Sequence, residues 1–189
     1  MSSIRLLGAL ILAMPALCAD SANPLLTESA LPYHLPPFEQ IRDGHFLPAI
    51  EQGMSEQLRE VDAIANNRAA PTFDNTIVAL ERSGTLLDRA RRAFGILEAS
   101  LTNPTLQKLD AELAPRLAAH DDAIEMNPAL FARIRKLYEQ RNSLELDAES
   151  LRLLERYYDD YVRNGASLSE EGKARLKAPV HLRFGLPTC

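Results

Sequence analysis

Signals for the start of a helix recur along this chain, each directly before apolar residues spaced three or four positions apart. The clearest are Asn103-Pro104 and Asn127-Pro128, which pair a capping side chain with a proline at the first helical position. Residues with helical spacing follow both pairs: Leu106, Leu109, Leu113, Leu117 and Ile124 after the first, and Leu130, Ile134 and Leu137 after the second. No stretch alternates with the period of two that marks a strand. The pattern predicts an all-α fold.

The spacing predicts about six amphipathic helices in all. The first opens near His45, with Pro48 tolerated in its first turn, and the next begins after Pro71, where Asp74 or Asn75 can act as the cap. The expected core-facing residues of these two segments are Phe46, Ile50, Met54, Leu58 and Val61, followed by Ile77, Leu80, Leu87, Phe94 and Leu101. Gly84 interrupts the second segment, so it marks either close helix packing or a break.

The last helices are predicted from their end signals. Asp147 can cap a helix that carries Leu151, Leu154, Tyr158 and Val162. Asn164-Gly165 ends this helix, because glycine readily takes the left-handed conformation at a C-terminus. A capping box formed by Ser167 and Glu170 then predicts one more short helix.

The first 22 residues are predicted to be a secretory signal peptide. Arg5 precedes an apolar run that ends at Met14, and small residues follow. The run is shorter than the ~20 residues of a stable membrane span, so we expect export to the periplasm and removal of residues 1–22. Two alternatives stay open: a core helix, and a lipoprotein anchored at Cys18, which Leu17 disfavours because a small residue should precede the cysteine. After cleavage Cys189 is the one thiol left, which leaves no internal disulfide.

The two ends of the remaining chain differ in character from the helices. Residues 23–43 are rich in proline, which predicts an extended segment lying against a supporting surface. Residues 178–189 read "APVHLRFGLPTC" and have no helical period. The predicted organisation is therefore a signal peptide (1–22), a helical region (23–177) and an unrelated tail (178–189).

No catalytic, cofactor-binding or metal-binding residues can be assigned from the pattern of the sequence. The net charge of −5 argues against a nucleic-acid partner. The four histidines (His34, His45, His120 and His181) are scattered, and none is followed by Glu as in the zinc-binding helix of metallopeptidases. We expect His120, beside Asp121 and Asp122, to be a solvated or C-terminal cap position rather than a metal ligand.

Three polar or aromatic groups are expected to be structural. Arg89, Arg91 and Arg92 form a basic turn that we expect to pair with nearby acids, although it could also meet a substrate carboxylate. Tyrosines 157, 158 and 161 are expected at the edge of the core. The acidic pairs 159–160 and 170–171 are expected on solvated faces or in a first helical turn.

Several stretches together resemble the N-terminal region of bacterial peptidyl-dipeptidases in the thimet-oligopeptidase-like family of zinc metallopeptidases. They are "NPLL", "LPYHLPPFEQIRDGHFLPAIEQGM" and "PTFDNTIVALERSGTLLDR", continued by "LTNPTLQKLDAELAPRLAAHDDAI", "NPALFARIRKLYEQR" and "LRLLERYYDDYVRNGASLSEEGKARLK". The resemblance covers residues 23–177, and its most specific part is the Phe-Asp-Asn-Thr-Ile core.

The resemblance implies an N-terminal helical part of a larger, two-half peptidase that removes dipeptides from the C-termini of short peptides. The family's zinc motif and further glutamate ligand match no position here, so we expect this chain to form a channel wall, to bind no zinc and to be inactive alone. Its partners would be short peptides together with a catalytic half, and the tail at residues 178–189 would be a truncation or a frameshift. The alternative is a free-standing helical module that binds peptides or proteins without catalysis.

Overall fold

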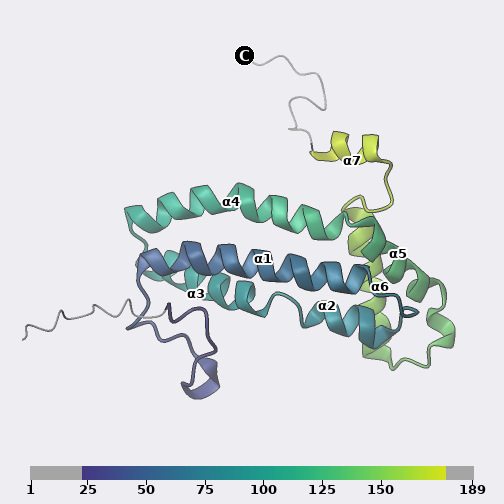
Figure 1. Ribbon diagram of the computed structural model, residues 1–189, viewed down its shortest axis with the longest axis horizontal. Helices are drawn as coiled ribbons and strands as arrows, with labels where there is room; N and C mark the ends of the chain where they lie inside the picture. The colour runs from purple at the N-terminus through teal and green to yellow at the C-terminus, as the bar shows by residue number, and fades with distance from the viewer. Residues whose placement is uncertain (1–22, 178–189) are drawn as a thin grey trace, which may run out of the picture.

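The computed structural model describes residues 23–177, and within them every regular element is helical. Three long helices lie side by side: α1 (Phe46–Ala65), α3 (Thr85–Leu101) and α4 (Pro104–Glu125). Figure 1 shows α1 between the other two, with α5 (Pro128–Glu139) and α6 (Ala148–Arg163) crossing one end of this layer. The short helix α7 (Glu170–Lys177) follows α6. The predicted all-α fold is confirmed.

Shorter elements connect the long helices. Two 3₁₀ turns, Pro32–His34 and Asp43–His45, belong to the N-terminal arm, and a third, Arg141–Ser143, joins α5 to α6. Before α3 the chain forms a π-helical turn, Asp74–Val78, which continues into the single turn α2 (Ala79–Glu81). The predicted second helix is therefore divided, and its division falls at Gly84.

Three of the predicted helix caps are found where expected. The side chains of Asn103 and Asn127 each accept two backbone N–H groups of the following turn, and Asp147 accepts the N–H of Ser150 at 2.7 Å. At the end of α6, Gly165 has a φ of 89°. This conformation lets the N–H of Ala166 reach the carbonyl of Tyr161 at 2.9 Å, as the predicted glycine stop requires.

Two predicted caps are wrong by a few residues. The helix after Pro71 is capped by Thr72, whose hydroxyl accepts the N–H of Asn75 at 3.1 Å while Asn75 Oδ1 accepts the N–H of Thr72 at 2.9 Å. Similarly, α7 is capped by Ser169, which accepts the N–H of Gly172, and not by Ser167. In both places several capping residues stand close together, and the local sequence does not decide which of them takes the extended backbone that a cap needs.

The core has two parts. The first lies between the N-terminal half of α1, α3 and α4, and the second lies between the C-terminal half of α1, α2, α5 and α6. The largest fully buried side chains are Phe46, Leu25, Ile50, Ile77, Leu106, Leu113, Leu130, Ile134, Leu137, Leu154 and Val61, with Thr76. Three predicted core positions are wrong: Leu58 on α1 is 39% exposed, Leu101 is 71% exposed at the end of α3, and Val162 is 38% exposed while the neighbouring Tyr161 is buried.

The proline-rich arm lies against α1 and α3, as its composition predicted. Leu25 and Ile41 are buried in the first part of the core. Asn23 Nδ2 donates to the carbonyl of His45 at 2.7 Å, and Arg89 Nε donates to the carbonyl of Leu25 at 3.0 Å. Polar contacts thus support a segment that forms few backbone hydrogen bonds of its own. The predicted signal peptide and tail lie outside the described residues.

Candidate functional site

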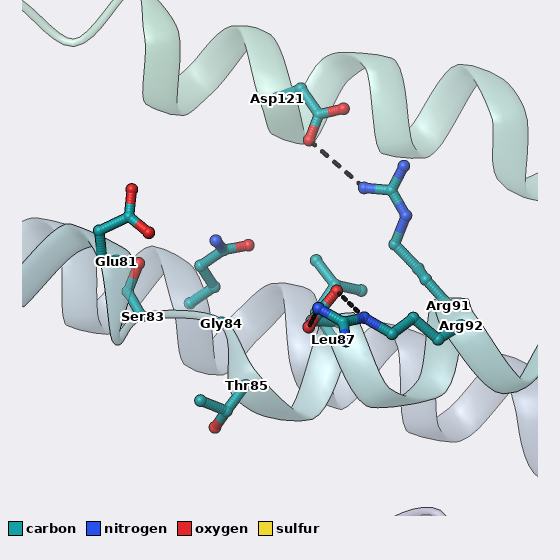
Figure 2. Close-up of a pocket in the computed structure, with 10 residues that line it drawn as sticks. Glu81, Ser83, Gly84, Thr85, Leu87, Arg91, Arg92 and Asp121 are labelled. Carbon is teal, nitrogen blue, oxygen red and sulfur yellow. Dashed lines mark hydrogen bonds and ion pairs between the residues drawn. The ribbon is translucent and has the colours of Figure 1, made fainter. Parts of the chain in front are cut away.

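A polar hollow lies where α2 ends and α3 begins. It has a volume of about 380 Å³ and lies between this break, α1 and α4. Figure 2 shows polar side chains around it, and the lining residues are Gln57, Glu81, Ser83, Gly84, Thr85, Leu87, Asp88, Arg91, Arg92 and Asp121. We call it the break pocket.

Gly84 gives the break pocket its shape. Its φ of 73° is left-handed, which a residue with a Cβ adopts only at a cost. Its N–H donates to Glu60 Oε2 at 2.7 Å, so a carboxylate on α1 replaces the intrahelical partner that the break removes. A Cβ at this position would also collide with the side-chain amide of Gln57. Both alternatives predicted for Gly84, a break and close packing, therefore apply.

The charged groups of the break pocket already have partners within the protein. Arg92 Nη2 lies 2.6 Å from Asp88 Oδ2, and Arg91 Nη1 lies 3.9 Å from Asp121 Oδ1. Glu81 Oε1 accepts the hydroxyl of Tyr157 at 2.8 Å. A pocket with paired charges offers little net attraction to a free ion, whereas its hydroxyl, amide and carboxylate groups suit the neutral N–H and C=O groups of a peptide backbone.

His120 contacts Gln57, one of the residues that line the break pocket. Only 5% of its surface is exposed, and its Nε2 lies 2.7 Å from Gln57 Oε1. An amide oxygen can only accept, so in this arrangement Nε2 carries the proton, while the buried Nδ1 has no partner among the described residues. The prediction of a solvated or C-terminal cap position is wrong. Helix α4 continues to Glu125, and the side of the helix that carries His120 packs against α1.

We expect stability to fall in mild acid because of His120. Burial lowers its pKa from 6.5, Asp121 raises it in part, and Arg91 lowers it further. The unfolded chain then binds the proton more readily, so the free energy of unfolding should fall as the pH drops below about 6.5 and level off once the pH passes the lowered folded pKa. Denaturant titrations at pH 7.5 and 5.5 should show a smaller loss for His120→Gln than for the wild type. An equal loss in both proteins would contradict this role.

Comparison of the sequence with known proteins identifies relatives of this chain. The chain is 48% identical over 157 residues to dipeptidyl carboxypeptidase of Salmonella typhimurium, a match that covers 83% of this chain and 23% of the relative. It is 44% identical over 155 residues to dipeptidyl carboxypeptidase of Escherichia coli, again over 23% of the relative. The chain is therefore similar in sequence to a part of dipeptidyl carboxypeptidase.

The chain is also similar, at lower identity, to a second kind of peptidase. Oligopeptidase A of Escherichia coli is 23% identical over 153 residues, which is 81% of this chain and 22% of that protein. No family model matches the chain. The chain thus spans about a quarter of the length of the curated relatives it matches, and the resemblance predicted from its sequence is confirmed.

The three histidines within residues 23–177 lie apart from one another. His34 lies in the arm, His45 precedes α1 and accepts the N–H of Arg42, and His120 is buried in α4, while His181 lies outside the described residues. Within residues 23–177 no three His, Cys, Asp or Glu side chains are placed to hold a metal ion. The residues present here do not fit a zinc site.

The other groups singled out in the sequence have structural partners. Arg91 and Arg92 pair with acids as predicted, whereas Arg89 binds a backbone carbonyl instead. Tyr157 and Tyr158 are partly buried at the edge of the second core part, as predicted, whereas Tyr161 is buried within it and stacks on Phe131 at a centroid distance of 6.4 Å. Asp160 pairs with arginines of its own helix on the surface. No helix of residues 23–177 is long and apolar enough to cross a membrane.

Most of the break pocket could not be found from the sequence. Gln57 and Glu60 come from α1, 24 residues or more before the groups they contact. Gly84, interrupting an apolar series, was the one signal that could have marked the place, because a glycine inside a helical pattern indicates a break or a close approach.

Proposed function

We propose that residues 23–177 form a non-catalytic part of a zinc-dependent peptidyl-dipeptidase, lining the channel through which short peptides reach the catalytic centre. The identity of 48% over 157 residues to dipeptidyl carboxypeptidase carries the proposal. Identity at this level, extended over most of the chain, supports a shared role in the same kind of enzyme. The reaction proposed is the removal of dipeptides from the C-termini of short peptides.

The zinc ligands of such an enzyme would lie outside residues 23–177. The sequence holds no His-Glu-x-x-His motif, and its described histidines lie on separate elements. The part played by this segment is then shape and hydrogen bonding. A channel wall selects by width, and the break pocket adds hydroxyl and amide groups that suit an extended peptide backbone.

A chimeric enzyme tests the proposal. Residues 23–177 replace the matching segment of dipeptidyl carboxypeptidase of Salmonella typhimurium, and dipeptide release from a blocked peptide is measured. Because the segment would supply the wall and none of the chemistry, we expect kcat/KM within about tenfold of the parent, a difference of about 1.4 kcal/mol in transition-state stabilisation.

Two controls accompany the chimera. The parent without its matching segment should lose dipeptide release, and the present chain alone should stay at background. A folded, zinc-loaded chimera without activity would contradict the shared role and favour the free-standing binding module. Dipeptide release by this chain alone would contradict the proposal that the segment is non-catalytic.

A further inference from the structure

A second hollow lies between the N-terminal arm and α3. Its volume is about 370 Å³, and we call it the arm groove. Both the arm and α3 contribute apolar and charged side chains to it: its lining residues are Glu28, Tyr33, His34, Leu35, Pro36, Thr85, Asp88, Arg89, Arg92 and Ile96. Tyr33, Leu35 and Ile96 are 95%, 55% and 49% exposed, so large apolar side chains face solvent beside the charges. Mixed apolar and polar walls at this size are typical of ligand sites.

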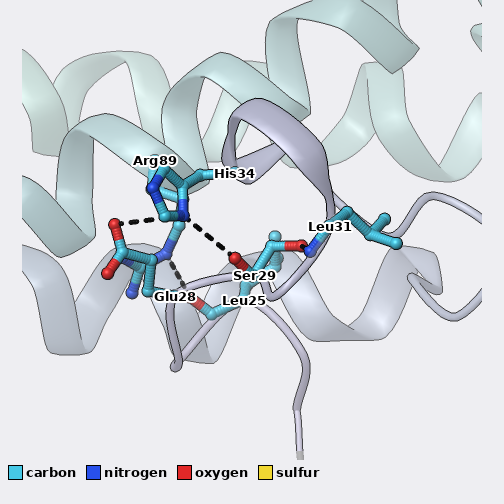
Figure 3. A network of polar contacts seen from close by, with 6 residues as sticks. All are labelled: Leu25, Glu28, Ser29, Leu31, His34 and Arg89. Carbon is cyan, nitrogen blue, oxygen red and sulfur yellow. Dashed lines mark hydrogen bonds and ion pairs between the residues drawn. The ribbon is translucent and has the colours of Figure 1, made fainter.

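Arg89 is the arginine of the arm groove that forms no ion pair among the described residues. Asp88 pairs with Arg92 at 2.6 Å, and Glu28 lies 3.5 Å from His34 Nδ1, a contact that is an ion pair when His34 is protonated. Arg89 donates its Nε to the carbonyl of Leu25 at 3.0 Å (Figure 3), and within residues 23–177 neither an ion pair nor a second hydrogen bond engages its terminal nitrogens. The contact to Leu25 holds the guanidinium in place. Its terminal nitrogens then stay available to donate to both oxygens of a carboxylate.

The arm is held in a strained conformation where it borders this groove. Tyr33 and His34 have φ values of 56° and 54°, a left-handed conformation that non-glycine residues adopt only at a cost. Contacts around His34 stabilise the turn: its N–H donates to Leu31, and its Nδ1 lies 3.1 Å from the carbonyl of Ser29 (Figure 3). The strain holds the ring of Tyr33 in solvent at the mouth of the groove. Such strain is found at binding sites more often than elsewhere.

We propose that the arm groove binds a peptide carboxylate, with Arg89 as the ligand of the carboxylate and Tyr33, Leu35 and Ile96 in contact with the adjoining apolar side chain. The carboxylate is that of a peptide C-terminus or of an acidic side chain. The inference rests on the proposed function for the class of ligand alone. It assigns a binding site in this segment that takes no part in hydrolysis.

Fluorescence anisotropy of labelled peptides with the full chain tests the site. The probes are Ala-Phe-Leu with a free carboxylate, the same peptide as a C-terminal amide, and amidated Glu-Phe-Leu, all with a chelator present so that no zinc-dependent hydrolysis intervenes. We expect the free acid to bind and its amide to bind at least about tenfold more weakly, because the amide cannot form the bidentate charge-assisted pair with a guanidinium. Binding of the glutamate peptide above the amide would assign the acidic side chain as a source of the carboxylate.

Variants connect binding to the groove. Arg89→Met should weaken binding of the acid at least about tenfold, while the matched control Arg59→Met, an exposed arginine on α1, should leave it unchanged. Ile96→Ser keeps the contact between Arg89 and Leu25 and should weaken all probes alike. In the wild type, titration with the acid should shift the NMR signal of Arg89 Nε–Hε, a measurement that does not depend on the folding of a variant.

Equal binding of all three probes, or binding of the carboxylate probes unchanged in Arg89→Met, would overturn the inference. These outcomes are separate from those of the chimera. An active chimera whose segment fails to bind the acid keeps the channel-wall function and removes the carboxylate site. A chain that binds the acid through Arg89 while the chimera is inactive does the reverse.

Discussion

Replacing Gly53 by alanine is expected to lower the free energy of unfolding by about 3 kcal/mol, at the upper end of what overpacking costs. Gly53 lies where α1 crosses α3, and a Cβ there would lie 2.7 Å from both Cα and N of Leu87. These are backbone atoms of a long helix, so no side-chain rotation relieves the contact and the two helices must separate. The gain of about 1 kcal/mol in helix propensity on replacing glycine offsets only part of this cost.

Gly95 provides the matched control. It lies inside α3, and a Cβ at this position meets no atom within 4 Å among the described residues. Gly95→Ala should therefore raise the free energy of unfolding by about 0.5–1 kcal/mol through helix propensity alone. Urea titrations of the two variants should give shifts of opposite sign with an unchanged m-value. Stabilisation by both substitutions would show that the crossing of α1 and α3 tolerates a wider spacing.

The second large effect is expected at Arg133, which is 7% exposed on α5. Its Nη1 donates to the carbonyls of Asn67 and Ala69 at 2.7 and 3.1 Å, and its Nη2 donates to Asn75 Oδ1 at 2.8 Å. The guanidinium thus ties the segment after α1 to the capped turn that begins the next helix. Burial lowers its pKa, and its Nε has no partner among the described residues.

Arg133→Met should lower the free energy of unfolding by about 2–3 kcal/mol. The substitution removes three charge-assisted hydrogen bonds, while rehydration of the freed carbonyls and relief of the buried charge return part of the energy. The matched control is Arg135→Met, which removes an exposed arginine whose Nε lies 3.8 Å from Glu139, and it should change stability by less than about 0.5 kcal/mol.

Hydrogen exchange distinguishes a local role of Arg133 from a general one. In Arg133→Met the amides of residues 69–75 should exchange faster than those of α3, because the hydrogen bonds of the guanidinium hold the segment around these residues and do not reach α3. Equal destabilisation by the two arginine variants, or faster exchange spread evenly over the chain, would contradict the role assigned to Arg133.

The helices could be predicted from the sequence because their signals are local. Asn103, Asn127 and Asp147 cap helices where the sequence placed them, since a cap needs only a side-chain oxygen and the N–H groups two or three residues on. The resemblance to peptidyl-dipeptidases could be recognised from sequence for a related reason: the order of residues carries it without any knowledge of their contacts. Competing caps at Thr72 and Ser169 show where this local information ends.

The candidate sites depended on contacts between residues far apart in the chain. Arg89 reaches Leu25 across 64 positions, His120 reaches Gln57 across 63, and Arg133 reaches Asn67 across 66. Each contact exists because the packing of helices buries one face of a helix and leaves another exposed. The spacing of apolar residues along the chain does not predict which helices will pack together. The sequence by itself therefore determined the all-α class, most helix ends and the resemblance to peptidyl-dipeptidases. The tertiary structure decided that His120 is buried, that Leu101 is exposed, and that Arg89 faces a groove in which no carboxylate of residues 23–177 forms an ion pair with it.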